Sequence, residues 1–198
     1  MDNTGTRRRR SVLLALTIGG LAAMSLTGVA MSMAQFTSQA TVPANTFTTG
    51  TVVISTSPTT SLLSVGNMAP GDTVNGSLVV TNAGSLNLRY AMSSSSTNAD
   101  VPVPLNLRSQ LSLQVKTLGT SCAAFDGADV VTSAVLSTNP GFGSNVQGAD
   151  PGDRTLAAAA SETLCFRVTL PLGTGNAFQG ATTTATFTFD AEQTKNNP

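Results

Sequence analysis

Residues 184–191 read Thr-Ala-Thr-Phe-Thr-Phe-Asp-Ala, so an apolar side chain stands at every second position. This alternation is the pattern of a strand with one face buried and the other in water. The same period returns over residues 73–82, 86–92, 111–116 and 164–170, and turn-forming Gly, Pro, Asn and Asp separate these stretches. We therefore predict about eight short antiparallel strands that form an all-β sandwich, most simply of the jelly-roll type.

Five further segments complete the predicted domain. Residues 47–56 and 130–136 are rich in β-branched side chains and are predicted strands. The serine run and the two prolines within residues 93–104 indicate a loop or a sheet edge, and the Gly- and Asn-rich residues 139–153 indicate a long surface loop. Residues 155–163 contain four consecutive alanines and are the one short helix predicted after the N-terminal region.

The N-terminal region has the pattern of an export signal. Four arginines at positions 7–10 precede an apolar segment over residues 12–34. Ser32 and Ala34 occupy the −3 and −1 positions of a cleavage after Ala34, and a cut after Ala30 is an alternative. The apolar segment is also long enough to span a bilayer, so an uncleaved membrane anchor stays open. We predict a signal helix that a signal peptidase removes, with the arginines on the cytoplasmic side and the rest of the chain exported.

The predicted domain organisation follows from these boundaries. Residues 1–34 form the signal peptide, and residues 35–193 form the sandwich domain with an N-terminal arm over residues 35–49. Residues 194–198 form a flexible tail. About 160 residues remain after cleavage, which is enough chain for one hydrophobic core.

The arm has two interpretations, and both start from the absence of any charged side chain between Ser11 and Gly71. The arm could be the first strand of its own sandwich, with its two phenylalanines in the core. It could equally leave its own domain and complete the sheet of a neighbouring subunit. We favour this donor strand, because sheet edges normally use charge and proline to prevent such pairing and the arm has only Pro43. The residues expected to make the contacts are Phe36, Thr37, Val42 and Phe47.

The composition excludes most catalytic and nucleic-acid-binding classes. The chain has no histidine, which removes His-Glu-x-x-His zinc sites, Ser-His-Asp and Cys-His arrangements, and a histidine general base. The part after Ala34 holds six bases and nine acids, a net charge of −3, so no basic patch for nucleic acid is expected. We predict a protein that is not an enzyme, binds no cofactor, and contacts the membrane only through the uncleaved signal.

The two cysteines, Cys122 and Cys165, fit an exported protein. In an oxidising compartment they can pair only with each other within one chain. Such a bond would close a loop of about 44 residues and stabilise the domain by about 4 kcal/mol. Cys165 lies on the strand face opposite the apolar residues, so the disulfide should tie a loop to the outer surface. The alternative is two free buried thiols.

Two acidic pairs are the candidates for a cation site. Asp126 with Asp129 and Asp150 with Asp153 lie in turn-rich stretches, and carboxylates with loop carbonyls are the ligands that calcium prefers. The sequence lacks the alternating acids of a calcium loop. Aspartates that cap turns are therefore the simpler interpretation, and we predict no metal-binding residue beyond these weak candidates.

Three sets of motifs resemble the TasA/camelysin group of bacterial extracellular matrix proteins. Ala-Gln-Phe-Thr-Ser at 34–38 and NTFTTGTVVIS at 45–55 resemble the family's aromatic residue after the cleavage site and its strand T-F-x-x-G-T-L-D-L-S. NMAPGD at 67–72 and TNAGSL at 81–86 are similar to the family's element N-L-K-P-G-D … N-x-G-S-L.

The third set is FQG at 178–180 with ATFTFDAEQ at 185–193, which is similar to the family's closing strand. All three sets occur in the family's order. Residues 93–160 show no match, and the cysteine pair within the chain is a departure from the family pattern.

The resemblance implies a jelly-roll subunit whose signal peptide is cut by a SipW-type peptidase. Such subunits self-associate into biofilm matrix fibres, in which the freed N-terminal strand inserts into the next subunit. We therefore expect a secreted structural protein of the extracellular matrix or cell surface. Two alternatives stay open: a camelysin-type secreted or cell-surface metalloendopeptidase, a label that some relatives carry, and a monomeric surface protein held in the membrane by its N-terminal segment.

Overall fold

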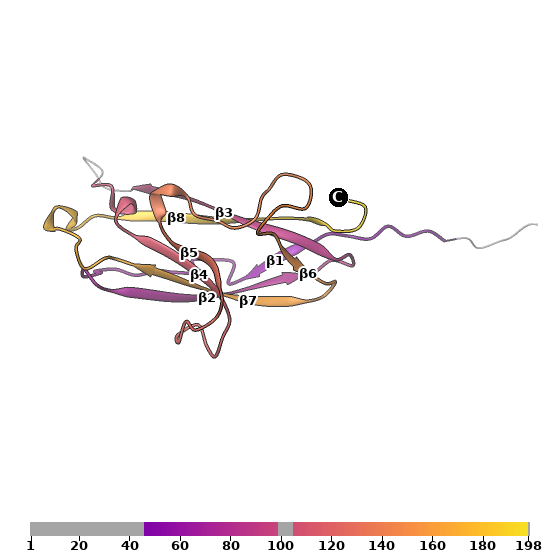
Figure 1. Ribbon diagram of the computed structural model, residues 1–198, viewed down its shortest axis with the longest axis horizontal. Helices are drawn as coiled ribbons and strands as arrows, with labels where there is room; N and C mark the ends of the chain where they lie inside the picture. Colours follow the sequence, from indigo (N-terminus) through magenta and orange to yellow (C-terminus); the bar gives the residue numbers. More distant parts are fainter. Residues whose placement is uncertain (1–45, 99–104, 198) are drawn as a thin grey trace, which may run out of the picture. The chain divides into compact units, whose positions relative to one another are not determined.

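The computed structural model describes residues 46–98 and 105–197 (Figure 1). The chain divides into two units, Met1–Phe47 and Thr48–Pro198. The described residues of the second unit form two antiparallel β-sheets, which confirms the predicted all-β sandwich. The predicted signal helix lies outside the described residues, and the jelly-roll type stays a prediction.

Five strands form the larger sheet, in the order β1-β2-β7-β4-β5, and three form the smaller one, in the order β6-β3-β8. The bounds in the larger sheet are β1 Ile54–Ser57, β2 Thr73–Asn82, β4 Ser112–Thr117, β5 Asp129–Val135 and β7 Ser161–Thr169. The bounds in the smaller sheet are β3 Leu88–Asn98, β6 Arg154–Leu156 and β8 Thr183–Gln193. In Figure 1 the smaller sheet, with β3 and β8 side by side, lies over β2, β4 and β7.

The core lies between the two sheets and is built by the alternation seen in the sequence. The largest fully buried apolar side chains come from four strands: Val80, Leu88, Tyr90, Met92, Leu113, Val115, Leu164 and Phe166. Each contributes about 1.5–3 kcal/mol of burial. Aromatic contacts join the sheets, with the Phe166 ring centroid 5.0 Å from that of Phe187.

The predicted helix over residues 155–163 is wrong. Arg154–Leu156 is strand β6, and β7 begins at Ser161. Residues 157–160 connect the two strands, with residues 157–159 exposed and Ala159 at a φ of 59°. The pairing of β7 with β2, which continues to Ser161↔Thr81, outweighs the helix propensity of a short alanine run. The described helical segments are three 3₁₀ turns, Leu107–Ser109, Leu136–Thr138 and Asn176–Phe178.

The serine run is a strand and not the loop that its composition suggests. β3 continues through it to Asn98, paired throughout with β8. Ser94 and Ser96 are buried, and their hydroxyls donate to the carbonyl oxygens of Pro140 at 2.6 Å and Leu136 at 3.0 Å. Small hydroxyl side chains therefore line this end of the sandwich because loop carbonyls accept their hydrogen bonds.

The first strand is shorter than predicted, because residues 48–53 lie outside β1 and have no regular secondary structure. The Thr51 carbonyl accepts hydrogen bonds from the N–H groups of Ser85 and Leu86, and the Val53 carbonyl accepts one from Ala83. This contact needs the glycine at position 84, because a Cβ there would lie 2.4 Å from the Thr51 oxygen.

Candidate functional site

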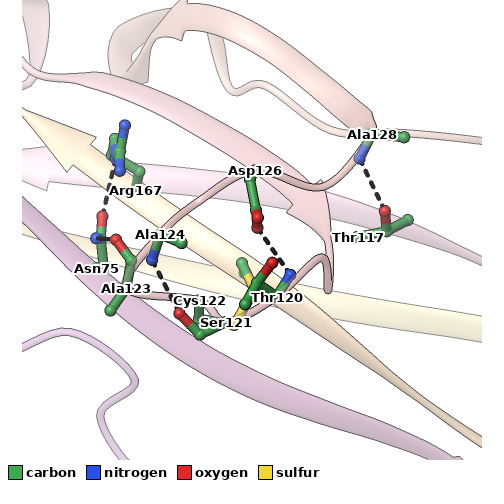
Figure 2. Close-up of a disulfide and its surroundings, with 11 residues drawn as sticks. Asn75, Thr117, Thr120, Ser121, Cys122, Ala123, Ala124, Asp126, Ala128 and Arg167 are labelled. Carbon is green, nitrogen blue, oxygen red and sulfur yellow. Dashed lines mark hydrogen bonds between the residues drawn. A yellow bond between two sulfur atoms is a disulfide. The ribbon is translucent and has the colours of Figure 1, made fainter.

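The predicted disulfide between Cys122 and Cys165 is present, with 5.0 Å between the Cα atoms (Figure 2). Cys165 lies on β7 between the core residues Leu164 and Phe166, so its side chain points to the outer face of the five-stranded sheet. The loop over residues 118–128 carries Cys122. The prediction that the bond ties a loop to the outer surface is confirmed, and Cys165 is 0% exposed.

Phe125 is the centre of this covering loop. It is only 5% exposed, and the Arg167 guanidinium lies 3.9 Å and the Lys116 ammonium 5.4 Å from its ring centroid. Asn75 on β2 completes the contact, because its side-chain amide donates to the Ala123 carbonyl and accepts from Arg167 Nε at 2.9 Å. The outer face of the sheet thus has a small apolar contact of its own, stabilised by cation–π interactions.

Asp126 and Asp129 have different partners and hold separate positions. The Thr120 N–H donates to Asp126 Oδ1 at 2.9 Å, and hydrogen bonds from Thr120 hold the pKa of the Asp126 carboxyl below its ordinary value. Asp129 Oδ1 accepts from Gln114 at 2.9 Å and lies 3.7 Å from the Lys116 ammonium. Asp126 therefore acts as a turn cap and Asp129 as one half of an edge ion pair.

Asp150 and Asp153 belong to one turn. Asp153 Oδ2 accepts from the Asp150 N–H at 3.0 Å, and its Oδ1 accepts from the Ser144 N–H at 3.0 Å. Both carboxylate oxygens of Asp153 therefore accept hydrogen bonds from backbone N–H groups of the preceding loop.

A metal centre of the peptidase kind needs about three protein ligands and a coordination position left open for water. Over residues 46–98 and 105–197, no three or more His, Cys, Asp or Glu side chains come close enough to hold a metal ion. The cysteines are joined to each other, and the chain has no histidine. The side chains of these described residues do not fit a catalytic metal.

A buried polar cluster joins the two sheets. The Tyr90 hydroxyl on β3 donates to Glu162 Oε1 on β7 at 2.6 Å, and Arg154 on β6 donates from Nε to the same carboxylate at 3.0 and 3.1 Å and again from Nη2. Burial raises the pKa of the Tyr90 phenol, and the bond to Glu162 acts in the same direction. The bond to Glu162 also raises the pKa of Arg154. The phenol therefore stays protonated, and the cluster is a structural link.

A second ionic contact ties β3 to β8 and to the chain end. Arg89 Nε donates to Glu192 Oε1 at 2.5 Å, and Arg89 Nη2 donates to the Asn197 carbonyl. Arg89, the Gly148 N–H and the Asn197 amide together hold the pKa of the Glu192 carboxyl below its ordinary value. Thr194 and Asn197 thus hydrogen-bond to the sandwich within the segment expected to be a flexible tail.

A cavity of about 280 Å³ lies beside this contact, between β3, the end of β8 and residues 144–147. Three carboxylates line it, those of Asp153, Asp190 and Glu192. The loop backbone engages Asp153, and Arg89 engages Glu192.

The predicted cleavage and donor residues lie mostly outside the part of the chain that the structure describes. Ala34, Phe36, Thr37 and Val42 lie outside the described residues. Phe47 is described, has no regular secondary structure, and its side chain is 93% exposed.

Sequence reasoning missed the Tyr90–Glu162–Arg154 cluster and the position of Phe125. The available signal was weak: Glu162 and Arg154 are single charges beside apolar strand residues, and Tyr90 is the only tyrosine of the chain. A lone charge next to a buried strand indicates that a partner is needed, but it does not identify the partner.

Comparison with known proteins finds a family match over part of the chain. Residues 12–104 match the family model described as camelysin metallo-endopeptidase, which confirms the resemblance to the TasA/camelysin group. No curated protein matches the chain. A solved structure described as "AvmM Catalyzes Macrocyclization in Alchivemycin A Biosynthesis" is similar over 69% of this chain and 72% of that chain, with 14% identity and a TM-score of 0.29. A TM-score this low says nothing about the function of the chain.

Within the described residues, no helix is long and apolar enough to cross a membrane.

Proposed function

We propose that this chain, whose residues 12–104 match the camelysin family, is a secreted structural subunit that self-associates into extracellular fibres. A signal peptidase would release the N-terminal arm, residues 35–49, and the arm would then add as a strand to the sheet of the next subunit. Its place would be the extracellular matrix or the cell surface.

The observation that carries the proposal is the neutral segment that leads into the sandwich. No charge occurs from Ser11 to Gly71, and within this segment the carbonyls of Thr51 and Val53 accept backbone hydrogen bonds from residues 83–86. Extended neutral chain that already pairs through its backbone is suited to strand addition, since charge and proline are what prevent pairing between chains.

The disulfide supports export. Cys122 and Cys165 form a bond of the kind that persists outside the reducing cytoplasm, and the arginines followed by an apolar segment have the pattern of a signal peptide. The cysteine pair lies outside the residues that match the family model, so this observation is independent of that match.

Deletion of residues 35–43 from the mature protein tests this proposal. The expected product is a folded monomer with the circular dichroism of the parent and no fibres in electron micrographs, because the donor strand is gone. The intact mature protein under the same conditions is the control. Fibres of normal length from the deletion variant would contradict the proposal.

The family description favours one second candidate, a metallo-endopeptidase. The absence of histidine and of any fitting acidic group in the described residues speaks against it. Cleavage of casein by homogeneous protein, with and without a chelator, separates the candidates. Chelator-sensitive cleavage would establish the peptidase.

An anchored monomer is excluded or established by the N-terminus of the exported protein. N-terminal sequencing that starts near Gln35 is incompatible with an anchor, whereas an intact arginine-rich N-terminus would establish one.

A further inference from the structure

We infer that the cavity on the outer face of the smaller sheet, together with the hydroxyl side chains that continue from it, binds a carbohydrate chain that carries free amino groups. The inference goes beyond the proposed function, because it concerns a surface of one subunit and does not depend on fibre assembly.

The floor of the cavity is the outer face of the smaller sheet. Ala91 on β3 lies opposite Asp190 on β8, and both point away from the core, because the residues before and after each of them pack in it. The loop of residues 139–153 lies against this face, since a Cβ on Gly143 would come within 2.9 Å of the Ala91 Cβ. In Figure 1 this loop, in orange, stands on the side of β3 and β8 that faces away from β2 and β7. Residues 144–147 form the wall of the cavity.

Three side chains that line the cavity are free to bind a ligand. The amides of Asn145 and Gln147 and the carboxylate of Asp190 are exposed, and none of them has a hydrogen bond or an ion pair to another described residue. Arg89 and Glu192, by contrast, already bind each other. Two amides and a carboxylate offer both donors and acceptors, which is what a ligand with several hydroxyl groups requires.

Charge and size narrow the ligand further. Three carboxylates and one guanidinium line the cavity, a net charge of −2, so a cation is attracted and an anion is repelled. At about 280 Å³ the cavity lies just below the range of sites for drug-sized ligands, so it suits a single ring with its substituents. A sugar unit with a free amine has this size and this charge, and its ammonium group would form a charge-assisted hydrogen bond with Asp190.

A hydroxyl row continues from the cavity along the same face. It consists of three cross-strand pairs of β3 and β8, which are Ser93 with Thr188, Ser95 with Thr186 and Thr97 with Thr184. All six side chains are exposed, and none of their hydroxyls has a hydrogen bond to another described residue. At the rise of an antiparallel strand the row is about 14 Å long.

The hydroxyl row favours a carbohydrate chain over other cations. Because a sugar chain presents hydroxyl groups along its whole length, the row can exchange hydrogen bonds with further units while the cavity holds one. A lysine-rich peptide has the same charge but no hydroxyl groups, and its backbone would pair with the edge of a sheet and not with its face. We therefore assign the cavity and the hydroxyl row to one extended site.

Binding of a fluorescently labelled glucosamine hexamer to the mature chain, followed by fluorescence anisotropy, tests the inference. Two matched probes accompany it: the N-acetylated hexamer keeps the sugar hydroxyls without the positive charge, and hexalysine keeps the charge without the hydroxyls. We expect the glucosamine hexamer to bind at least ~10-fold more tightly than either probe, because it alone satisfies both parts of the site. Equal binding of the N-acetylated hexamer, or tighter binding of hexalysine, would overturn the inference.

The anisotropy reports binding to monomers and to assembled chains alike. Its result is therefore separate from the test of the proposed function, and a mature chain that stays monomeric can still bind the hexamer.

A matched pair of charge variants locates the site. Asp190→Asn removes the free carboxylate of the cavity, and Asp129→Asn makes the same change of net charge on β5, in the other sheet. We expect the glucosamine hexamer to bind at least ~10-fold more weakly to Asp190→Asn and as tightly as before to Asp129→Asn. The same loss in both variants, or no loss in Asp190→Asn, would overturn the inference.

A second pair tests the hydroxyl row. Thr186→Val removes the central hydroxyl of β8 and keeps a β-branched side chain, and Thr132→Val does the same at an exposed position of β5. Thr186→Val should bind the hexamer at least about threefold more weakly, and single glucosamine, which the cavity alone holds, as well as before. Thr132→Val should change neither affinity. An unchanged hexamer affinity in Thr186→Val would overturn the assignment of the row to the site.

Discussion

The outer face of the five-stranded sheet and the free edge of β8 would both be exposed to solvent if the two sheets alone were present. Over the outer face, residues 118–128 fold back, a disulfide fixes them, and Phe125 lies between two cations. Beside β8, no described strand adds to the edge and the phenylalanines stay partly exposed. The chain thus closes the first surface itself, whereas the second lies open within the described residues.

This contrast separates two kinds of mutational effect. Changes in the closed region should alter the free energy of unfolding of one subunit and leave assembly intact. Changes at the open edge should alter assembly and leave the monomer folded. The following predictions are ordered by the expected loss of stability.

Replacement of both cysteines by serine should have the largest effect. With a sequence separation of 43 residues, loss of the bond should lower the free energy of unfolding by about 4 kcal/mol in urea titrations. Fibres should still form at temperatures where the variant is folded. Loss of fibres from a folded double variant would show that the two surfaces are coupled.

Phe125→Ala should cost about 3 kcal/mol of unfolding free energy, because it removes a nearly buried ring and the cover that the ring provides over the sheet. Phe125→Leu is the matched control that keeps apolar volume and loses the cation–π contacts, at a cost of about 1 kcal/mol. Equal losses from the two variants would show that the cations, and not burial, hold the loop.

Glu162→Gln tests whether the link between the sheets is also part of the closed subunit. Tyr90 and Arg154 lose the carboxylate that they share, and we expect the free energy of unfolding to fall by about 2 kcal/mol. Tyr90→Phe removes a single bond and should cost about 1 kcal/mol. A shift in fibre yield without a shift in the urea midpoint would contradict a purely structural role.

The smallest effect is the pH dependence of the Glu192 contact on β8. Because the folded protein holds this pKa below its ordinary value of 4.5, the contact stabilises the fold above that pH and is lost as the pH falls through the lower folded value. The melting temperature should therefore drop on acidification, and Glu192→Gln should reduce that drop. An identical acid profile in the variant would contradict the assignment.

Alternation predicted the strands that carry the core, and the bounds 73–82 of β2 are those expected from its sequence. The wrong predictions for the alanine run and the serine run have one physical cause: contacts between distant parts of the chain outweigh local composition. The alanine run has the composition of a helix, but the residues on either side of it pair in strands β6 and β7. The serines of β3 have the composition of a loop, but Ser94 and Ser96 are buried because the carbonyls of Pro140 and Leu136 accept their hydrogen bonds.

Prediction of the disulfide, the Glu162 cluster and the contacts of Phe125 is limited by tertiary context in the same way. Two cysteines with no competitor could be paired from the sequence, because elimination leaves one partner. The partners of Glu162, and the two cations around Phe125, depend on register between distant strands, which no local pattern records. For the same reason, the sequence alone does not indicate that β8 is an edge strand, since this depends on the strand order of the sheet.

The assembly state of the mature chain, with and without residues 35–43, tests the central claim most directly. The mature chain should form fibres that sediment rapidly, and the chain without these residues should sediment as a folded monomer. Fibres from the shortened chain, or a mature chain that stays monomeric at every concentration, would contradict the account.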